Sequence, residues 1–309
     1  MQVALVVGLK KNLMHKMKIE ADKIYKNFPL KNLNTWKVGG PADQYIEIAN
    51  IDFLAKKLKN KELEFPLSII GMGSNLLISD SGVSGTVINI SKNLKKLEKN
   101  KNHIYAEAGV SCSSLARYAA RNNKSNCAFM AGIPGSIGGA LAMNAGCYGN
   151  ETWDFVTKVK VIDFEGNIYE SKKDNYAVSY RTARSSKNEF FIGAYFEFPD
   201  SKESADESME IKKLLNARKL SQPLNWPTAG STFKNPENDF AAKLIEDCHL
   251  KGHIIGGARV SEKHANFIEN IGHATAKDIE TLIQYMKKTV KEIKNIDLEV
   301  EIKFLGEIS

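Results

Sequence analysis

The sequence predicts an α+β protein in which strands come first and the longest helical pattern comes late. Residues 28–198 are rich in glycine and in short apolar runs that are typical of strands. A polar segment at 200–208 marks a boundary or the start of a helix, and a helical pattern runs from it to about Lys219. Residues 221–309 are more mixed. We therefore expect a strand-rich first region followed by a smaller second region.

Five runs of the first region are expected to form strands. They lie at residues 67–70, 86–90, 104–108, 158–164 and 190–198. The triplet EGN at 165–167 predicts a hairpin turn between residues 159–164 and 168–170. Ser111 precedes Leu115, Tyr118 and Ala119 at helical spacing, which predicts one helix here.

The second region is predicted to hold a long helix and a final strand. Thr275 and Asp278 resemble a capping box with Asp in the Glu position. A helical apolar stripe follows, at Ile279, Leu282, Ile283, Met286, Val290 and Ile293. We interpret this stripe as core. A strand is predicted last, with four alternating apolar residues on one face: Leu298, Val300, Ile302 and Phe304.

The bulk composition is that of a soluble globular protein. The 309 residues suit about two or three domains, and the hydrophobic (43%) and charged (26%) fractions are ordinary. No stretch approaches the ~18 to 20 apolar residues of a membrane span. The N-terminal apolar run precedes its basic cluster, which reverses the order of a secretory signal. We expect a cytoplasmic protein with no membrane partner.

Neither the cysteines nor the charge balance indicates a metal or nucleic-acid protein. None of the 4 cysteines forms a C-x-x-C pair, and the 6 histidines lack ligand spacing, so we predict free thiols and no metal. A net charge of +7 suits nucleic acid or small anions. Because no recognition-helix motif or aromatic-interleaved basic stripe is present, we predict small phosphorylated ligands, with a plain solvated surface as the alternative.

Two glycine-rich segments carry the chemical signal of the first region. Residues 70–77 read IGMGSNLL, and residues 132–149 contain six glycines within GIPGSIGGA and MNAGCYG. Glycine lets a ligand approach the backbone, and successive exposed N–H groups form an anion cradle. Tight turns in a strand-rich domain are the alternative. Neither segment is a Rossmann fingerprint or a P-loop, yet together they predict a diphosphate site.

These segments resemble the two FAD-diphosphate loops of the vanillyl-alcohol-oxidase superfamily. Residues 34–42, NTWKVGGPA, are similar to the family pattern N-T-x-x-x-G-G-x-A. Downstream motifs narrow the resemblance to the UDP-N-acetylenolpyruvoylglucosamine reductase family. They are, in order, MNAGCYG (143–149), YR (180–181), GSTFKNP (230–236), LKGHIIGG (250–257), VSEKHANFI (260–268) and VEI (300–302). The short 181–231 interval and the QPL at 222–224 resemble the shorter class, which lacks an inserted tyrosine loop.

The resemblance implies a domain plan. A vanillyl-alcohol-oxidase/PCMH-type FAD-binding domain in two parts would span residues 28–200, with subdomains at about 28–92 and 93–200. A smaller α/β substrate-binding domain would span 201–309, and its last strand would pack back toward the FAD domain. Residues 1–27 would form an extension. Two departures from the family pattern concern flavin contacts. Ala128 stands where the family has an acidic residue. Ala183 stands where the family has a serine, whose role Ser185 or Ser186 would have to take.

The resemblance also implies a reaction and its catalytic residues. The family reduces the enolpyruvyl ether of UDP-N-acetylglucosamine to UDP-N-acetylmuramate for peptidoglycan synthesis, with tightly bound, non-covalent FAD and with NADPH as co-substrate. Arg181 would bind the substrate carboxylate, because its planar fork suits that group. Glu301 would help to stabilise the enol form, and Ser231 would donate the proton to the middle carbon.

Binding residues follow from the same motifs. The FAD-binding residues implied are Gly71, Gly73, Ser74, Asn75, Leu76, Pro134, Gly135, Ser136, Gly138, Gly139, Asn144, Ala145, Gly146 and Tyr180. Arg218, Lys234 and Asn235 are implied for the UDP-sugar, with Lys219, Lys263 and His264 as further candidates.

Pattern alone favours blander roles for the catalytic residues. Arg181 would be a surface arginine, Ser231 a turn residue after Gly230, and Glu301 a solvated glutamate opposite the apolar face of its strand. A different FAD oxidase and a non-catalytic electron-transfer subunit are the alternatives at the level of function. We expect a monomer with small-molecule partners only.

Overall fold

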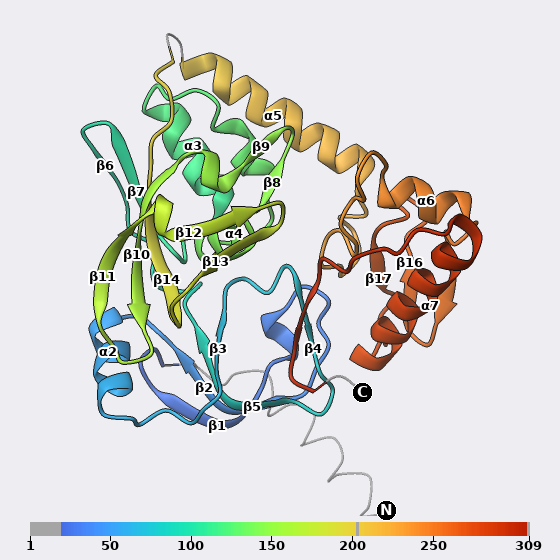
Figure 1. Ribbon diagram of the computed structural model, residues 1–309, viewed down its shortest axis with the longest axis horizontal. Helices are drawn as coiled ribbons and strands as arrows, with labels where there is room; N and C mark the ends of the chain where they lie inside the picture. The colour runs from blue at the N-terminus through green and yellow to red at the C-terminus, as the bar shows by residue number, and fades with distance from the viewer. Residues whose placement is uncertain (1–19, 202–203, 308–309) are drawn as a thin grey trace, which may run out of the picture.

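The computed structural model describes residues 20–201 and 204–307 and arranges them in three lobes (Figure 1). The first lobe holds a four-stranded sheet in the order β1-β2-β5-β3, in which β1 and β2 are antiparallel and the other pairs are parallel. Its elements are β1 (Ile24–Pro29), η2 (Lys31–Leu33), β2 (Pro41–Glu47), α2 (Ile51–Lys59), β3 (Leu67–Ile70), β4 (Leu76–Ile78) and β5 (Val83–Asn89).

Strand β1 corrects the predicted N-terminal boundary. It starts at Ile24, inside the stretch assigned to an extension, and pairs with β2 along its whole length. Phe28 of β1 stacks on Tyr45 of β2 at 4.2 Å between ring centroids. Because β1 is an edge strand with Lys26 and Asn27 in its middle, its sequence lacks the clean alternation that marks a strand. Residues 1–19 lie outside the described part of the chain.

The second lobe is built on a five-stranded antiparallel sheet in the order β11-β10-β14-β7-β6. Its strands are β6 (Leu97–Asn100), β7 (His103–Glu107), β10 (Val156–Asp163), β11 (Ile168–Lys172) and β14 (Glu189–Phe196). The other elements of this lobe are α3 (Cys112–Arg121), η3 (Ala128–Gly132), α4 (Ile137–Met143), β8 (Gly146–Cys147), β9 (Asn150–Glu151), η4 (Thr152–Asp154), η5 (Lys173–Asn175), β12 (Tyr176–Ser179) and β13 (Thr182–Ser185).

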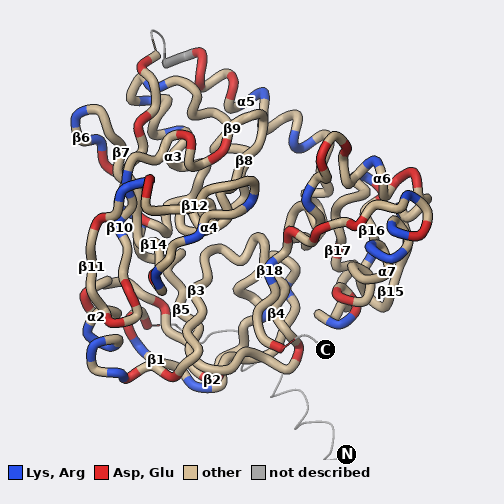
Figure 2. The backbone as a smooth tube through the Cα atoms, in the orientation of Figure 1, with Lys and Arg blue, Asp and Glu red and all other residues tan. Residues whose placement is uncertain are grey.

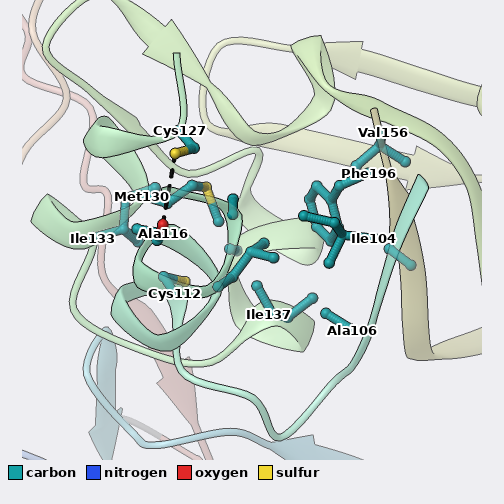
Figure 3. Close-up of a cluster of buried hydrophobic side chains, with 14 of the residues drawn as sticks. Ile104, Ala106, Cys112, Ala116, Cys127, Met130, Ile133, Ile137, Val156 and Phe196 are labelled. Atoms are coloured by element: carbon teal, nitrogen blue, oxygen red, sulfur yellow. Dashed lines mark hydrogen bonds between the residues drawn. The ribbon is translucent and has the colours of Figure 1, made fainter. Parts of the chain in front are cut away.

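A large apolar core fills the space between this sheet and the helices α3 and α4. Phe196 and Ile104 of the sheet belong to one buried cluster with Met130, which precedes the second glycine-rich segment, and Ile137, which lies within it (Figure 3). The Cys127 thiol donates to the Ala116 carbonyl at 3.6 Å, which satisfies a buried sulfur (Figure 3). The glycine-rich segment therefore rests on a rigid base.

The strand and helix predictions for these lobes are confirmed. Strand β3 has the predicted bounds, the other four predicted strands fall on β5, β7, β10 and β14, and the EGN turn joins β10 to β11. Helix α3 begins after Ser111, whose side chain accepts from the Ser114 backbone N–H.

Helix α5 (Ser204–Ser221) runs from the second lobe to the third (Figure 1). The third lobe contains α6 (Ala241–Asp247), β15 (Ile254–Ile255), β16 (Ala258–Val260), β17 (Ile268–Asn270) and α7 (Ala276–Lys294). The predicted capping box of Thr275 and Asp278 is present at the start of α7. The apolar stripe of α7 is buried as predicted, except that Ile293 is exposed.

The predicted final strand is shorter than expected. Only β18 (Lys303–Leu305) is regular, and it pairs in parallel with β4 of the first lobe. Leu298 and Ile302 are buried, but Phe304 is exposed. The segment before β18 touches residues 231–234 through the single bridge between Phe233 and Val300, so the alternation does not continue along one sheet.

Within residues 20–201 and 204–307, no helix is long and apolar enough to cross a bilayer. The same residues contain no group of three or more metal-binding side chains, and the four cysteines are free.

Candidate active site

A cavity of about 550 Å³ lies where the three lobes meet. Both glycine-rich segments line it, together with residues of the β12–β13 turn, the end of α5, the segment 229–231 and the last strand. Of the predicted site residues, its lining includes Gly71, Gly73, Ser74, Asn75, Leu76, Pro134, Gly135, Ser136, Gly139, Ala145, Gly146, Arg181, Arg218, Ser231 and Glu301.

The glycine-rich wall is bare backbone because side chains do not fit there. A Cβ on Gly73 would collide with the Leu33 carbonyl, and its φ of +67° disfavours any other residue. A Cβ on Gly71 would lie 2.7 Å from the Ser136 hydroxyl. Ser74 Oγ donates to the Pro134 carbonyl at 2.6 Å, which ties the two segments together.

Ser136 supplies an unsatisfied polar group to this wall. Its Oγ is buried and has no hydrogen-bond partner among the described residues. A buried hydroxyl without a partner is costly, so it points to a polar ligand group that completes the site.

Arg181 projects from a tight turn. Residues 180 and 181 connect β12 to β13, with Ser179 paired to Thr182, and Arg181 adopts a φ of +56°. A non-glycine residue in this left-handed region is uncommon and often marks a functional position. The Arg181 guanidinium lies 4.8 Å from the Tyr180 ring centroid and donates to the Gly146 carbonyl at 3.0 Å.

Glu301 faces Arg181 inside the cavity. Its Oε1 lies 3.0 Å from Arg181 Nε, and the two side chains are only 16% and 18% exposed. Burial raises the pKa of the Glu301 carboxyl, while Arg181, Lys234 and Lys303 oppose that rise. The solvated position that pattern alone favoured for Glu301 is therefore wrong, because the end of the chain lies against the cavity and not against solvent.

Backbone hydrogen bonds bring Ser231 next to Glu301. The Glu301 N–H donates to the Thr232 carbonyl at 2.9 Å, and Ser231 itself bridges to Phe267. The Asn266 side chain holds Phe233 twice, because Oδ1 accepts from its N–H at 2.9 Å and Nδ2 donates to its carbonyl at 2.8 Å. Three residues far apart in sequence, Arg181, Ser231 and Glu301, thus line one cavity.

Arg218 adds a second partly buried cation. Its Nε donates to Gln222 Oε1 at 2.8 Å, and burial lowers the pKa of its guanidinium, which stays charged at neutral pH. With Lys303, the lining carries three cationic side chains and one carboxylate. The cavity therefore suits anionic ligands.

Other predicted binding residues lie elsewhere. Gly138 borders a second cavity, of about 330 Å³, which shares Gly71 and Gly139 with the first. Asn144 is buried and donates to Glu151 at 2.6 Å. Tyr180 is 44% exposed beneath Arg181.

The predicted substrate residues also make protein contacts. Lys234 Nζ pairs with Glu299 at 2.6 Å, and Asn235 Oδ1 accepts from the Ala241 N–H that starts α6. Lys263 Nζ donates to the Lys219 carbonyl at 2.7 Å, and the His264 ring packs on Phe267.

The cavity lining also includes residues that the sequence did not predict as binding residues, among them Lys303 and Gln222. Each had a spacing signal: Lys303 lies two residues after Glu301 in an extended segment, and Gln222 lies four residues after Arg218 at the end of a helix. Gln222 opens the QPL motif at 222–224, but that motif implied a class of the family and not a binding role, and Lys303 lies just beyond the VEI motif.

Comparison with known proteins decides the family. Residues 42–172 match an FAD binding domain, and residues 222–305 match the C-terminal domain of UDP-N-acetylenolpyruvoylglucosamine reductase. The UDP-N-acetylenolpyruvoylglucosamine reductase of Legionella pneumophila (strain Paris) is 48% identical over 284 residues, which cover 91% of this chain and 93% of the relative. The chain belongs to the UDP-N-acetylenolpyruvoylglucosamine reductase family.

Other members of this family agree. The reductase of Nitrosospira multiformis is 42% identical and covers 90% of this chain and 87% of its own length. A crystal structure of the reductase from Thermus caldophilus has a TM-score of 0.76 at 29% identity and covers 92% of this chain and 98% of that chain. The predicted family and fold class are confirmed: a two-part FAD-binding domain of the vanillyl-alcohol-oxidase/PCMH type precedes a smaller substrate-binding domain.

The glycine-rich wall fits the FAD that this family binds, so the chain is an FAD-dependent oxidoreductase. Gly71 and Gly73 line the cavity with their backbone, and the unpaired, buried Ser136 hydroxyl can donate to a diphosphate there. The cationic side chains on the opposite wall suit a second anionic ligand on that side of the cavity.

Proposed function

We propose that this cavity is where the enzyme reduces the enolpyruvyl ether of UDP-N-acetylglucosamine to UDP-N-acetylmuramate, with Arg181, Glu301 and Ser231 acting on the substrate. The observation that carries the proposal is that these three residues line one cavity together with the glycine-rich wall. FAD held along the glycine-rich wall would supply the hydride chemistry, which carries two electrons from NADPH to the terminal carbon of the enolpyruvyl double bond.

Arg181 would bind and orient the substrate carboxylate. A guanidinium has five N–H donors in a fixed fork. Glu301 and the Gly146 carbonyl occupy one side of it, and the remaining donors can take a carboxylate in the bidentate manner. The left-handed turn at Arg181 and the Tyr180 ring fix the fork in place, so little side-chain entropy is lost on binding.

Glu301 would act as a neutral acid beside that carboxylate. Burial already raises the pKa of Glu301, and the arrival of a second carboxylate raises it further. A protonated Glu301 can donate a hydrogen bond where negative charge develops. This stabilises the enol form that precedes protonation of the middle carbon.

Ser231 would deliver that proton. It follows Gly230, whose φ of +81° turns the chain toward the cavity, and its segment is fixed to Glu301 by the Thr232 carbonyl. A hydroxyl is a weak acid, so donation depends on the polar surroundings of Ser231, which include Glu301.

Arg218 and Lys303 would hold the UDP diphosphate, and the second cavity would hold the adenine end of FAD. The two cavities are adjacent, because Ile69, Gly71, Gly139 and Ala142 line both, so one extended cofactor would reach from one to the other. The Lys234 ammonium pairs with Glu299, and the Asn235 amide oxygen accepts from the Ala241 N–H. Contacts of these two side chains with the substrate therefore stay predictions.

An anaerobic experiment tests the proposal. We expect NADPH to bleach the bound flavin, and the enolpyruvyl substrate to restore its colour. UDP-N-acetylglucosamine, which lacks the double bond, should not restore it. Reoxidation only by oxygen would indicate a different oxidase, and flavin that no UDP-sugar reoxidises would indicate an electron-transfer subunit.

We further propose that the enzyme works as a cytoplasmic monomer. Light scattering during gel filtration should give a mass near 34.3 kDa. A mass of twice that value at micromolar concentration would exclude the monomer.

A further inference from the structure

Asn75 belongs to the first glycine-rich segment, but its amide contacts the backbone just before β18. Its Nδ2 donates to the Glu301 carbonyl at 3.1 Å and lies 3.8 Å from the Met143 sulfur. We propose that Asn75 is a positioning residue that fixes Glu301 relative to the flavin-binding wall. This inference rests on the proposed role of Glu301.

Two bonds join Asn75 to the strand on either side of Ile302. Besides the amide contact with Glu301, the Asn75 backbone carbonyl accepts from the Lys303 N–H at 3.0 Å. The ladder between β18 and β4 begins at the next pair, Lys303 with Leu76. The Asn75 amide therefore extends this short ladder by one further hydrogen bond, up to the catalytic residue.

Glu301 is held from both sides through its backbone. Its N–H donates to Thr232, next to Ser231, and its carbonyl accepts from Asn75, in the flavin-binding wall. The backbone of Glu301 is thus the point at which the proton-donor segment and the glycine-rich wall meet. Because its carboxylate lies 3.0 Å from Arg181, a small shift of this backbone changes the carboxylate geometry.

Two roles of Asn75 predict different defects when its side chain is changed. As a phosphate ligand it would matter for FAD retention. As a positioning residue it would matter for the reaction with the enolpyruvyl substrate. One neutral hydrogen bond is a small part of the stability of a folded protein, so FAD binding and folding should survive its loss.

Asn75→Ala and Asn75→Asp test the role of the amide. Alanine removes the donor at every pH, whereas aspartate lacks the donor when ionised and regains it when protonated. We expect both holoenzymes to retain FAD and to be reduced by NADPH within a few-fold of the wild-type rate. Reoxidation by the enolpyruvyl substrate should slow by about 10- to 10²-fold at pH 8.

The pH dependence distinguishes a missing donor from general damage. Relative to wild type, Asn75→Asp should recover as the pH falls and its carboxyl takes up a proton, while Asn75→Ala should not recover. Asn122→Asp is the matched control, since Asn122 donates its amide to the Tyr118 carbonyl at 2.9 Å on α3, outside the cavity lining. This variant should keep both half-reactions.

Hydrogen exchange gives a readout that does not depend on turnover. In both Asn75 variants of the holoenzyme, the amides of Glu301 and Lys303 should exchange faster than in wild type, and those of α7 should not change. Loss of FAD, equal slowing of both half-reactions, unchanged exchange, or the same pH profile in both variants would overturn the positioning role. If wild type itself fails to react with the substrate, the proposed function fails, and exchange at residues 301–303 still decides whether Asn75 holds the strand.

Discussion

The two walls of the cavity are built by opposite means. The glycine-rich wall presents backbone, and residues 67–79 and 128–150 carry no charged side chain (Figure 2). The other wall presents charged side chains from three separate segments, around Arg181, Arg218 and Glu301, with Ser231 between them in a fourth. The first wall is determined by local turns, and the second exists only when distant segments are held together. Substitutions should therefore affect the two half-reactions differently.

The largest effect is expected for Ser231→Ala. If Ser231 donates the proton, reoxidation of the flavin by substrate should fall by roughly 10²- to 10⁴-fold, while reduction by NADPH stays near normal. Ser231→Cys should recover part of the rate, because a thiol still donates a proton. Rapid-mixing absorbance of the flavin band separates the two half-reactions.

Ser125→Ala is the control for this measurement. Its hydroxyl contacts the Pro199 carbonyl, away from the cavity lining. If Ser231→Ala reacts with substrate within a few-fold of wild type, the proton comes from another group. Ser231 would then have no catalytic role in the wall opposite the glycine-rich one.

Gly73→Ala should damage the backbone wall. The positive φ alone costs about 1 to 3 kcal/mol, and the collision with Leu33 adds to it. We expect a lower denaturation midpoint and loss of FAD together. Gly149→Ala has a similar φ of +84° but open space around its Cβ, so it should show only the conformational cost. Equal losses in both variants would mean that the close approach at Gly73 has no effect.

Arg181→Lys should affect the charged wall. A compact ammonium keeps the charge but cannot present two parallel N–H groups to a carboxylate. Losing one charge-assisted bond corresponds to about 1.5 to 3 kcal/mol, or roughly 10- to 10²-fold in the substrate half-reaction. Arg184→Lys, on the exposed face of the same hairpin, is the control. Near-normal turnover of the Arg181→Lys variant would remove the fork from the mechanism.

The smallest effect is a pH-dependent change in stability for Glu301→Gln. The pKa of Glu301 is raised in the folded state, so its proton contributes stability that is present below the unfolded value, near 4.5, and is lost as the pH rises through the folded value. Glutamine has no such proton. The unfolding free energy of the variant should therefore gain on wild type as the pH rises above 4.5.

Each pKa unit between the folded and unfolded states of Glu301 corresponds to about 1.4 kcal/mol in the difference in unfolding free energy between variant and wild type. Urea denaturation at several pH values measures it. A gain that shrinks with rising pH would mean that the ion pair with Arg181 outweighs the burial of Glu301.

Sequence predicted the features of the fold that depend on neighbouring residues. The Thr275 cap of α7, the β10–β11 hairpin and the glycine-rich segments are local, and the structure contains them where they were expected. Strand β1 was missed because it is an edge strand whose pairing with β2 compensates for a weak pattern.

The charged wall could be predicted only through motifs shared with a family. Nothing in the residues around Glu301 reveals that they face a cavity, because that depends on β18 reaching β4. For the same reason the sequence could not show that the Asn75 amide lies against the Glu301 carbonyl, and its contact with FAD stays a prediction.

The pairing of β18 with β4 has a consequence for folding kinetics. Asn75 and Glu301 are 226 residues apart, so their contact closes a long loop and carries an entropic cost that local contacts avoid. We expect these hydrogen bonds to be absent from the folding transition state, with φ-values near zero. Substitutions there would then speed unfolding and leave the folding rate almost unchanged. The active site would be the last part of the molecule to assemble and the first to open.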